Sequence, residues 1–273
     1  MARGKTTTVL TTRVGVGSGV RPDRLVVEEP LEIRLDDQLV ATTMRTPGHD
    51  YELAAGFCHT DGLLAGAPVR TVRYCATGSA VETAFNVVSV STGGVAPTPS
   101  ARLQRTTSSC GLCGSASIDA LLERLVPRKG APVPVDLDAL TVAARDTRAR
   151  QELFEATGSI HAAAAFDPVT GAVELVREDI GRHNAVDKVV GRLLLDGHLP
   201  AEGRALFVSG RASFEIVQKA WAAGFGLVAA VSGPSALAVD TARTAGITLV
   251  GFLRGETANV YAPEPALISR ATG

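Results

Sequence analysis

Residues 205–256 read ALFVSGRASFEIVQKAWAAGFGLVAAVSGPSALAVDTARTAGITLVGFLRGE. Short apolar runs at 205–209, 227–231 and 247–253 alternate with segments of helical pattern at 214–223 and 236–245. Apolar strands that alternate with helices are typical of a parallel or mixed sheet covered on both faces. This stretch therefore predicts a three-layer α/β unit.

The same pattern extends upstream of this stretch. A helix is predicted over 137–157, strands over 160–166 and 172–178, and a further helix over 185–195. The run PRKGAPVPV at 127–135 has the composition of a linker, and we place a domain boundary there. Residues 136–273 thus form the predicted second domain, and the fold class is α/β overall.

Residues 21–135 are predicted to form a small α+β domain. Its expected elements are a β-hairpin over 24–43 that turns at Asp36 and Asp37, a helix within 46–64, strands over 69–74 and 84–91, and a short helix at 117–125. Residues 1–20 are rich in Thr and Gly and lack a long apolar centre, so we interpret them as a floppy leader rather than a secretory signal.

The balance of positive and negative residues limits the kinds of partner that the protein can bind. The 273 residues include 27 Lys or Arg and 28 Asp or Glu, which leaves a net charge of -1 and no overall field to hold nucleic acid or an anionic membrane. No apolar stretch reaches the roughly 18 to 20 residues that span a bilayer. We therefore expect a cytoplasmic protein that holds any anion locally.

The segment TTSSCGLCGSASID at 106–119 places the thiols of Cys110 and Cys113 just before a predicted helix. The amino end of a helix lowers the pKa of a nearby thiol and raises its thiolate fraction. Gly111 and Gly114 leave space beside both sulfurs for a second molecule. Such a motif is found in half zinc sites, in thioredoxin-like dithiols and in persulfide carriers.

The three alternatives differ in what else they require. Zinc needs two further ligands, and Cys58 and Cys75 form no second Cys-x-x-Cys pair, so we expect no intrinsic metal. A thioredoxin motif should follow a strand in an early βαβ unit, whereas this one follows a Gly/Pro loop near the middle of the chain. For Cys58 and Cys75 we expect burial as apolar side chains.

A second polar cluster, EDIGRHNAVDKVVG at 178–191, lies at a strand-to-helix transition. Arg182 and His183 are expected at the helix start, where backbone N–H groups favour a phosphate. Ser209, Gly210 and Arg211 follow the next strand, and ligands of open α/β sheets bind outside the carboxyl ends of strands. Asp187 and Lys188 fit a salt-bridged helix equally well, and no dinucleotide or P-loop motif is present.

These motifs together resemble one known family, that of the formate dehydrogenase accessory sulfurtransferases (FdhD). The matching segments, in the family's order, are EEPLEIRL, MRTPGHDYELAAGF, SSCGLCGSASID, EDIGRHNAVDK, SGRASFEIVQKA, VSGPSALAVDTA and GITLVGFLRGETANVY. The resemblance covers the chain apart from the leader and the linker. TDG at 60–62 and TGSIH at 157–161 depart from the pattern, which leaves the role of His161 open.

The resemblance implies a function and its partners. A cysteine desulfurase would supply persulfide sulfur, which Cys110 would carry with the help of Cys113. The sulfur would pass to the bis(molybdopterin guanine dinucleotide) molybdenum cofactor before its insertion into formate dehydrogenase. The segment that resembles the family's cofactor-binding loop consists of Phe252, Leu253, Arg254, Gly255, Glu256 and Thr257.

The resemblance also implies a homodimer and a second domain similar to the cytidine deaminases. The deaminase zinc pattern, His-x-Glu followed by Pro-Cys-x-x-Cys, does not occur in the sequence. Our leading hypothesis is a sulfurtransferase that acts as a persulfide carrier. A cofactor chaperone that leaves sulfur untouched is the second hypothesis, and a zinc hydrolase or deaminase is the third.

Overall fold

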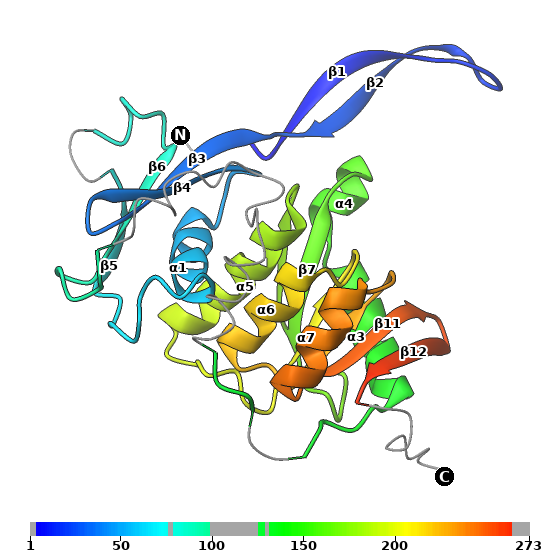
Figure 1. Ribbon diagram of the computed structural model, residues 1–273. Coiled ribbons are helices and arrows are strands. Elements are labelled where there is room, and N and C mark those ends of the chain that lie inside the picture. Colours follow the sequence, from blue (N-terminus) through cyan, green and yellow to red (C-terminus); the bar gives the residue numbers. More distant parts are fainter. Residues whose placement is uncertain (1–3, 76–78, 99–124, 129–130, 264–273) are drawn as a thin grey trace.

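The computed structural model describes residues 4–75, 79–98, 125–128 and 131–263. They form two units, each built on a β-sheet, that pack on each other through helices (Figure 1). This confirms the predicted α/β class. Cys110, Cys113 and the helix predicted at 117–125 belong to the segment 99–124, which lies outside the described residues.

The second unit contains a mixed six-stranded sheet with the order β12-β11-β10-β9-β7-β8. Its strands are β7 (His161–Phe166), β8 (Val173–Asp179), β9 (Ala205–Val208), β10 (Leu227–Ala230), β11 (Thr248–Arg254) and β12 (Thr257–Ala262). β9, β10 and β11 are parallel, whereas β7 is antiparallel to both β8 and β9. The carboxyl ends of β8, β9, β10 and β11 therefore share one edge of the sheet, which we call the carboxyl edge.

Helices cover both faces of this sheet. They are α3 (Leu137–Ala149), α4 (Glu152–Thr157), α5 (Arg182–Leu195), α6 (Phe214–Ala223) and α7 (Ala236–Ala245). Along β9, Leu206 and Val208 join the apolar core under α5, α6 and α7, while Phe207 joins Leu140 of α3 in the core of the other face. In Figure 1 α5, α6 and α7 lie in front of the sheet and α3 lies behind it. The predicted three-layer arrangement is confirmed.

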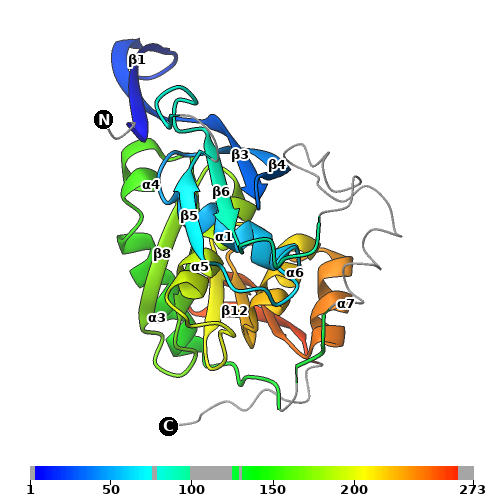
Figure 2. The ribbon, with the colours of Figure 1, turned by 90° about the vertical axis from the view of Figure 1, so that its left-hand side faces the viewer.

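The N-terminal unit has a four-stranded sheet with the order β4-β3-β6-β5. Its elements are β3 (Glu29–Leu35), β4 (Gln38–Arg45), α1 (Asp50–Thr60), β5 (Thr71–Tyr74) and β6 (Val87–Ser91). The predicted hairpin is β3–β4, and its two turn residues Asp36 and Asp37 both have positive φ, at 44° and 68°, as a two-residue hairpin turn requires. Helix α1 lies between this sheet and α5 (Figure 2).

Two glycines bring α1 and α5 into close contact. A Cβ atom on Gly56 would lie 1.9 Å from the carbonyl oxygen of Asp187, and one on Gly191 would lie 1.7 Å from that of Glu52. No side chain fits at either distance. The two backbones therefore touch directly, which joins the two units where α1 and α5 cross.

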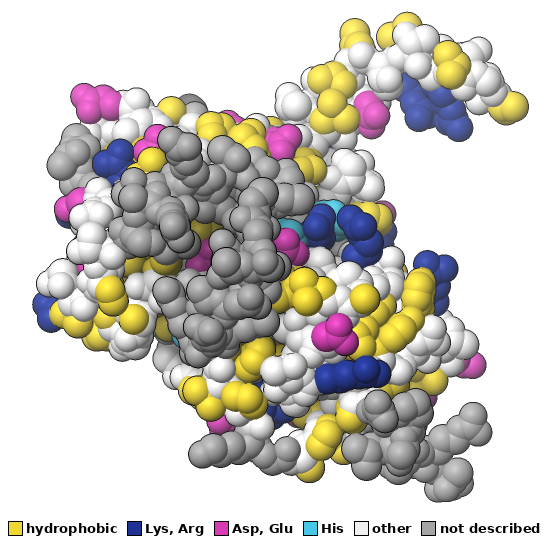
Figure 3. Space-filling model, viewed as in Figure 1, with side chains coloured by type: hydrophobic (Ala, Val, Ile, Leu, Met, Phe, Trp, Pro, Cys, Tyr) yellow, Lys and Arg dark blue, Asp and Glu magenta, His cyan; other side chains and the backbone are white. Residues whose placement is uncertain are grey.

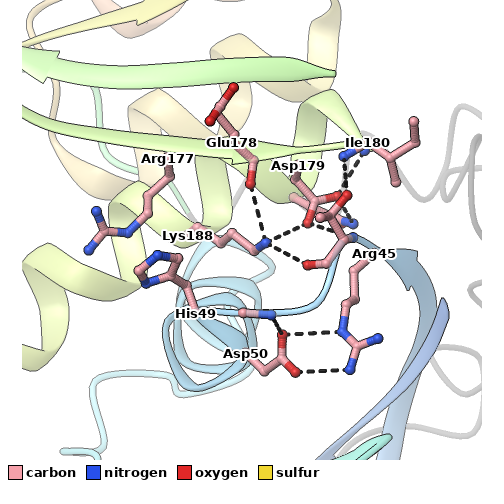
Figure 4. A network of polar contacts seen from close by, with 12 residues as sticks. Arg45, His49, Asp50, Arg177, Glu178, Asp179, Ile180 and Lys188 are labelled. Carbon is pink, nitrogen blue, oxygen red and sulfur yellow. Dashed lines mark hydrogen bonds and ion pairs between the residues drawn. The ribbon is translucent and has the colours of Figure 1, made fainter. Parts of the chain in front are cut away.

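Buried charges surround this contact (Figure 4). The Lys188 Nζ lies 2.6 Å from Asp179 Oδ2 and donates to the carbonyl oxygen of Thr46 at 3.0 Å. The Arg45 Nη2 lies 2.9 Å from Asp50 Oδ2, and both side chains are almost fully buried. Because charges are buried at low cost only when they are paired, this network holds the segment between β4 and α1 against the second unit.

The predicted leader has more structure than expected. Residues 1–20 were interpreted as floppy, but β1 (Thr6–Arg13) and β2 (Gly19–Val26) pair as an antiparallel hairpin that extends from the body of the molecule (Figure 1). The physical reason is local. β-Branched Thr and Val favour a strand at 6–12, and Gly15 and Gly17 supply the positive φ of the turn.

Three further boundaries differ from the predictions. The helix predicted over 137–157 is two helices, α3 and α4, with a break at Arg150 and Gln151. Strand β12 was not predicted at all. Described residues in and beside the predicted linker contact the second unit: Trp221 donates to the carbonyl of Val126, and Thr248 donates to that of Val133. In the described part of the chain, no helix is long and apolar enough to cross a membrane.

Candidate functional site

The loops after β9, β10 and β11 lie side by side at the carboxyl edge. The backbone N–H of Ser232, after β10, donates to the carbonyl of Gly210 at 3.2 Å. The N–H of Phe252 in turn donates to the carbonyl of Ser232 at 3.3 Å. The structure thus brings Ser209, Gly210 and Arg211 next to Phe252, as their positions at strand ends predicted.

The amino end of α5 borders the same loops. Arg182, His183 and Asn184 form its first turn, which confirms their predicted place. His183 Nε2 lies 3.3 Å from the Ser213 hydroxyl and 3.6 Å from a carboxylate oxygen of Glu215, both on the segment that follows Arg211. The amino ends of α5 and α6 therefore meet at one place.

Neither helix uses a side-chain cap there. The residue before α5 is Gly181 and the residue before α6 is Ser213, and neither side chain accepts a bond from its helix. Asp179 accepts from the N–H of Gly181 at 2.8 Å, so it supports the turn before α5 rather than capping the helix itself. At the start of α6 the Glu215 carboxylate accepts from the backbone N–H of Glu215, whereas the uncapped N–H groups at the start of α5 are available to an anion.

Three arginines at this edge have no carboxylate partner among the described residues: Arg182, Arg211 and Arg254. The Nε of Arg182 is buried and makes no hydrogen bond. Arg254 lies over the Phe252 ring at 6.0 Å, and Arg211 is exposed. On the face shown in Figure 3, basic and His side chains lie together between the two units.

Two histidines of this region, His161 and His183, have lowered pKa values. Burial, together with the neighbouring charges of Arg182 and Lys219, lowers the pKa of His183 to about 4. Burial and Arg182 also lower the pKa of His161. Both imidazoles are therefore neutral at pH 7, and the arginines supply the positive charge that an anionic ligand would meet.

The segment from Phe252 to Thr257 is the end of a hairpin rather than a loop. Phe252, Leu253 and Arg254 finish β11, Gly255 and Glu256 form the turn, and Thr257 begins β12. Leu253 is buried in the core on the α3 side, whereas Phe252 has a φ of 52° at a β-bulge and is 40% exposed. The bulge turns Phe252 out toward Gly233 at the edge.

Other singled-out residues have structural partners. Asp187 and Lys188 are both buried and ion-paired, Asp187 with Lys219 and Lys188 with Asp179. Cys58 and Cys75 are buried free cysteines, as expected, and burial raises the pKa of Cys58. Within the described ranges, no three His, Cys, Asp or Glu side chains are grouped so that they could hold a metal ion.

Sequence reasoning missed three residues of this region. His161 lies beside Gly210, because a Cβ atom on Gly210 would lie 3.4 Å from His161 Nδ1. Ser213 and Glu215 contact His183. The position of His161 at the start of β7 was the one available signal, since β7 runs antiparallel to β9 and starts at the carboxyl edge.

Comparison with known proteins identifies the family. The model of the FdhD/NarQ family matches residues 26–268. The chain belongs to this family. Among FdhD/NarQ relatives, a protein named sulfur carrier protein FdhD from Streptomyces avermitilis is 50% identical over 259 residues, which cover 92% of this chain and 91% of that protein. The protein of the same name from Mycobacterium tuberculosis is 49% identical over 255 residues, covering 88% and 90%.

A solved structure shares the FdhD/NarQ chain's fold. It is described as a formate dehydrogenase accessory protein from Desulfotalea psychrophila and superposes with a TM-score of 0.77. The alignment covers 97% of this chain and 100% of that one at 23% sequence identity. This likeness establishes the fold that carries the carboxyl edge.

Proposed function

We propose that this protein is a sulfurtransferase that carries persulfide sulfur in the cytoplasm for formate dehydrogenase. Cys110 accepts the sulfur from a cysteine desulfurase and delivers it to the bis(molybdopterin guanine dinucleotide) cofactor before insertion. The observation that supports this most is the match to proteins named sulfur carriers over about nine tenths of the chain. The basic carboxyl edge supports the cofactor part.

The first chemical step is an exchange between persulfide and thiolate. The Cys110 thiolate attacks the outer sulfur of the desulfurase persulfide, a new S–S bond forms, and the desulfurase cysteine leaves as a thiolate. Release follows when the Cys113 thiolate attacks the Cys110 Sγ and expels the outer sulfur as hydrosulfide. The two thiols supply both electrons, and a cellular thiol then reduces the resulting disulfide.

The cofactor would be held through its phosphates. Each guanine dinucleotide arm carries a pyrophosphate, and the carboxyl edge offers the guanidinium groups of Arg182, Arg211 and Arg254 together with the amino end of α5. Arginine and helix amino ends are both suited to bind phosphate. The donors present therefore fit the charge and the chemistry of this substrate.

The test of sulfur transfer is mass spectrometry after loading by a cysteine desulfurase and cysteine. We expect one added sulfur on Cys110 in the wild type, none there in Cys110→Ala, and normal loading in the control Cys75→Ser, which changes a buried thiol. Loading that is unchanged in Cys110→Ala overturns the proposal.

The chaperone alternative is tested by restoring formate dehydrogenase activity in cells that lack this protein. A sulfur carrier requires Cys110, so the variant in which Cys110 and Cys113 are both replaced by Ala should restore no activity. Full activity from this variant, combined with loss in Arg211→Ala, would favour a chaperone that only binds the cofactor.

The homodimer is part of the same proposal. Light scattering during size-exclusion chromatography should give about twice the chain mass of 28.2 kDa. A mass of one chain at the concentrations used for loading would contradict it.

A further inference from the structure

The hairpin of β1 and β2 extends from the body of the molecule, and we call it the arm (Figure 1). Among the described residues, β1 and β2 pair only with each other, so both edges of the arm lack a partner strand. An isolated two-stranded hairpin is marginally stable in water, and each open edge offers backbone N–H and C=O groups to another strand. The arm is therefore a candidate surface for strand pairing.

The hydrogen-bond pattern of the arm determines which backbone groups point outward. The N–H of Val27 donates to the carbonyl of Lys5 at 2.9 Å, and every second pair along an antiparallel ladder is bonded in this way. The residues of β1 that direct their N–H and C=O groups away from β2 are therefore Thr6, Thr8, Leu10 and Thr12. By the same alternation, Pro22 lies at an outward position of β2.

The edge of β2 is protected against pairing, whereas the edge of β1 is not. Pro22 has no N–H to donate at its outward position, and Arg21 and Asp23 flank it. Proline and charged side chains are the usual means by which edge strands avoid further pairing. The stretch TTTVLTT at 6–12 contains neither, and its pairing with β2 has no bulge. The arm can therefore take a further strand at β1.

We propose that β1 of one chain pairs antiparallel with β1 of a second copy, so that the two arms form one four-stranded sheet. This inference rests on the homodimer of the proposed function and names its contact. A two-fold axis brings the same edge of both copies together, so the edge has to be complementary to itself. An uncharged stretch of Thr, Val and Leu meets this condition, because Thr and Val favour strands and their cross-strand pairs stabilise a sheet.

Charge selects the register of this pairing. With the two-fold axis at Val9, Lys5 would lie opposite the partner's Arg13, and like charges directly opposite each other destabilise a sheet. With the axis at Leu10, Arg13 lies opposite the partner's Thr7, and neither flanking charge meets a like charge. Leu10 is 77% exposed in one chain and then packs against the partner's Leu10.

The same register covers the exposed valines at the tip of the arm. Val14 and Val16 are 84% and 96% exposed in one chain. In an antiparallel pairing about Leu10, the tip of each arm lies beside the base of the partner's arm, where β1 begins and β2 contacts α4. The pairing therefore removes apolar surface from water at both ends of the joined sheet as well as at its centre.

The first test is a disulfide across the two-fold axis, in a chain whose Cys110 and Cys113 are both replaced by Ala. Leu10→Cys should give a covalent dimer with oxidised glutathione, because the Cα atoms of a bonded antiparallel pair lie about 5.5 Å apart, within the range of a disulfide. The control Val20→Cys is 70% exposed on the same face of the arm, but the two β1 strands separate it from its copy. It should give no covalent dimer in electrophoresis without reductant.

The second test is the dissociation constant of the dimer, measured by sedimentation equilibrium. Leu10→Lys places two positive charges at the axis and should raise this constant about tenfold. Val169→Lys adds the same charge away from the arm, at a position with the same exposed fraction of 77%, and should leave the constant unchanged. Both variants should unfold in urea as the wild type does, because neither side chain is buried in the fold.

The outcomes separate the arm from the rest of the proposed function. A dimer whose dissociation constant is unchanged in Leu10→Lys, or whose Leu10→Cys chains cross-link no more than Val20→Cys chains, overturns the arm pairing and leaves the homodimer. A wild-type chain that stays monomeric overturns both, while persulfide loading of Cys110 still decides the sulfur carrier. Selective cross-linking in Leu10→Cys, together with a weaker dimer in Leu10→Lys, supports the pairing.

Discussion

At the scale of single residues, Arg182 in the first turn of α5 is one of the arginines proposed to bind phosphate. Its guanidinium lacks a carboxylate partner among the described residues, and its Nε is buried without a hydrogen bond. Arg182→Gln should weaken pyrophosphate binding about tenfold and reduce the dependence of affinity on salt, because a charge-assisted contact is lost. Calorimetry at two ionic strengths measures both effects. Arg145→Gln, which changes an arginine paired with the adjacent Asp146, should leave them unchanged.

Arg182→Gln should also change the pKa of His183. Burial is the largest cause of the lowered His183 pKa, and the Arg182 charge is the next largest. Removing a nearby positive charge favours the protonated imidazole, so the pKa of His183 should rise above its value of about 4 in Arg182→Gln. NMR titration of the imidazole protons measures this. A pKa that stays at the wild-type value would show that the Arg182 charge does not reach His183.

Lys219 is a buried cation that forms ion pairs within the fold. Its Nζ lies 3.0 Å from Asp187 Oδ2 and 3.0 Å from Asp61 Oδ1, and burial raises the pKa of Asp187 to about 6. Lys219→Met would leave two carboxylates without their cation, and we expect it to lower the free energy of unfolding at pH 7 by about 3 to 5 kcal/mol.

The sign of the pH effect follows from the raised carboxyl pKa. Folded Lys219→Met binds a proton on Asp187 more readily than the unfolded chain does, so the variant should recover stability as the pH falls from 7 to 5. Urea unfolding across this range measures it. Arg204→Met, which changes a partly exposed partner of Glu174, should cost at most about 1 kcal/mol and show no such recovery.

At the scale of elements, the crossing of α1 and α5 depends on two glycines. Gly56→Ala or Gly191→Ala would force a Cβ atom to within 2 Å of a backbone carbonyl oxygen, and backbone cannot move aside as a flexible side chain can. In each variant the free energy of unfolding, measured in urea, should be lower by about 3 kcal/mol or more. This is the upper end of the usual cost of overpacking. Gly4→Ala, where a Cβ atom would lie at an ordinary 3.4 Å from its neighbour, serves as the control. Full stability in either variant would contradict the crossing.

The sequence pattern was sufficient for the elements of the second unit whose signal is local. The helices predicted over 214–223 and 236–245 have those bounds in the structure, because Gly224 and Gly246 end them with positive φ. Strand β12 was missed since TANVYA mixes polar and apolar residues at the edge of a sheet. The break between α3 and α4 could not be predicted, because the residue that caps α4 is Glu178, more than twenty residues away in the sequence.

The same limit on prediction from local sequence applies to the candidate site. Arg182, His183, Ser209, Gly210 and Arg211 could be placed together, because the carboxyl ends of parallel strands share an edge. The contacts of Ser213 and Glu215 with His183 could not be found in this way. They depend on how the amino ends of α5 and α6 meet in three dimensions.

At the scale of the whole molecule, the two units are joined by a carboxylate on α1 that meets cations of the second unit. Glu52 is 7% exposed, accepts from Arg177 of β8 at 2.9 Å, and lies 4.0 Å from Arg192 of α5. Burial alone would raise the pKa of Glu52, but the bonds and charges of Arg177 and His49 outweigh it and lower that pKa to about 2. The contact therefore favours the ionised carboxylate.

Because the folded pKa of Glu52 is lowered from 4.5, its contribution to stability is present above about pH 4.5 and is lost as the pH falls toward 2. Glu52→Gln should lower the free energy of unfolding at pH 7 by about 2 to 3 kcal/mol and flatten the loss of stability in this acid range. Urea unfolding from pH 3 to pH 7 measures both, with Glu32→Gln as a control at a partly exposed pair. If Glu52→Gln loses stability in acid as steeply as the wild type does, other carboxylates cause that loss. Glu52 would then not be the group that holds α1 against the second unit.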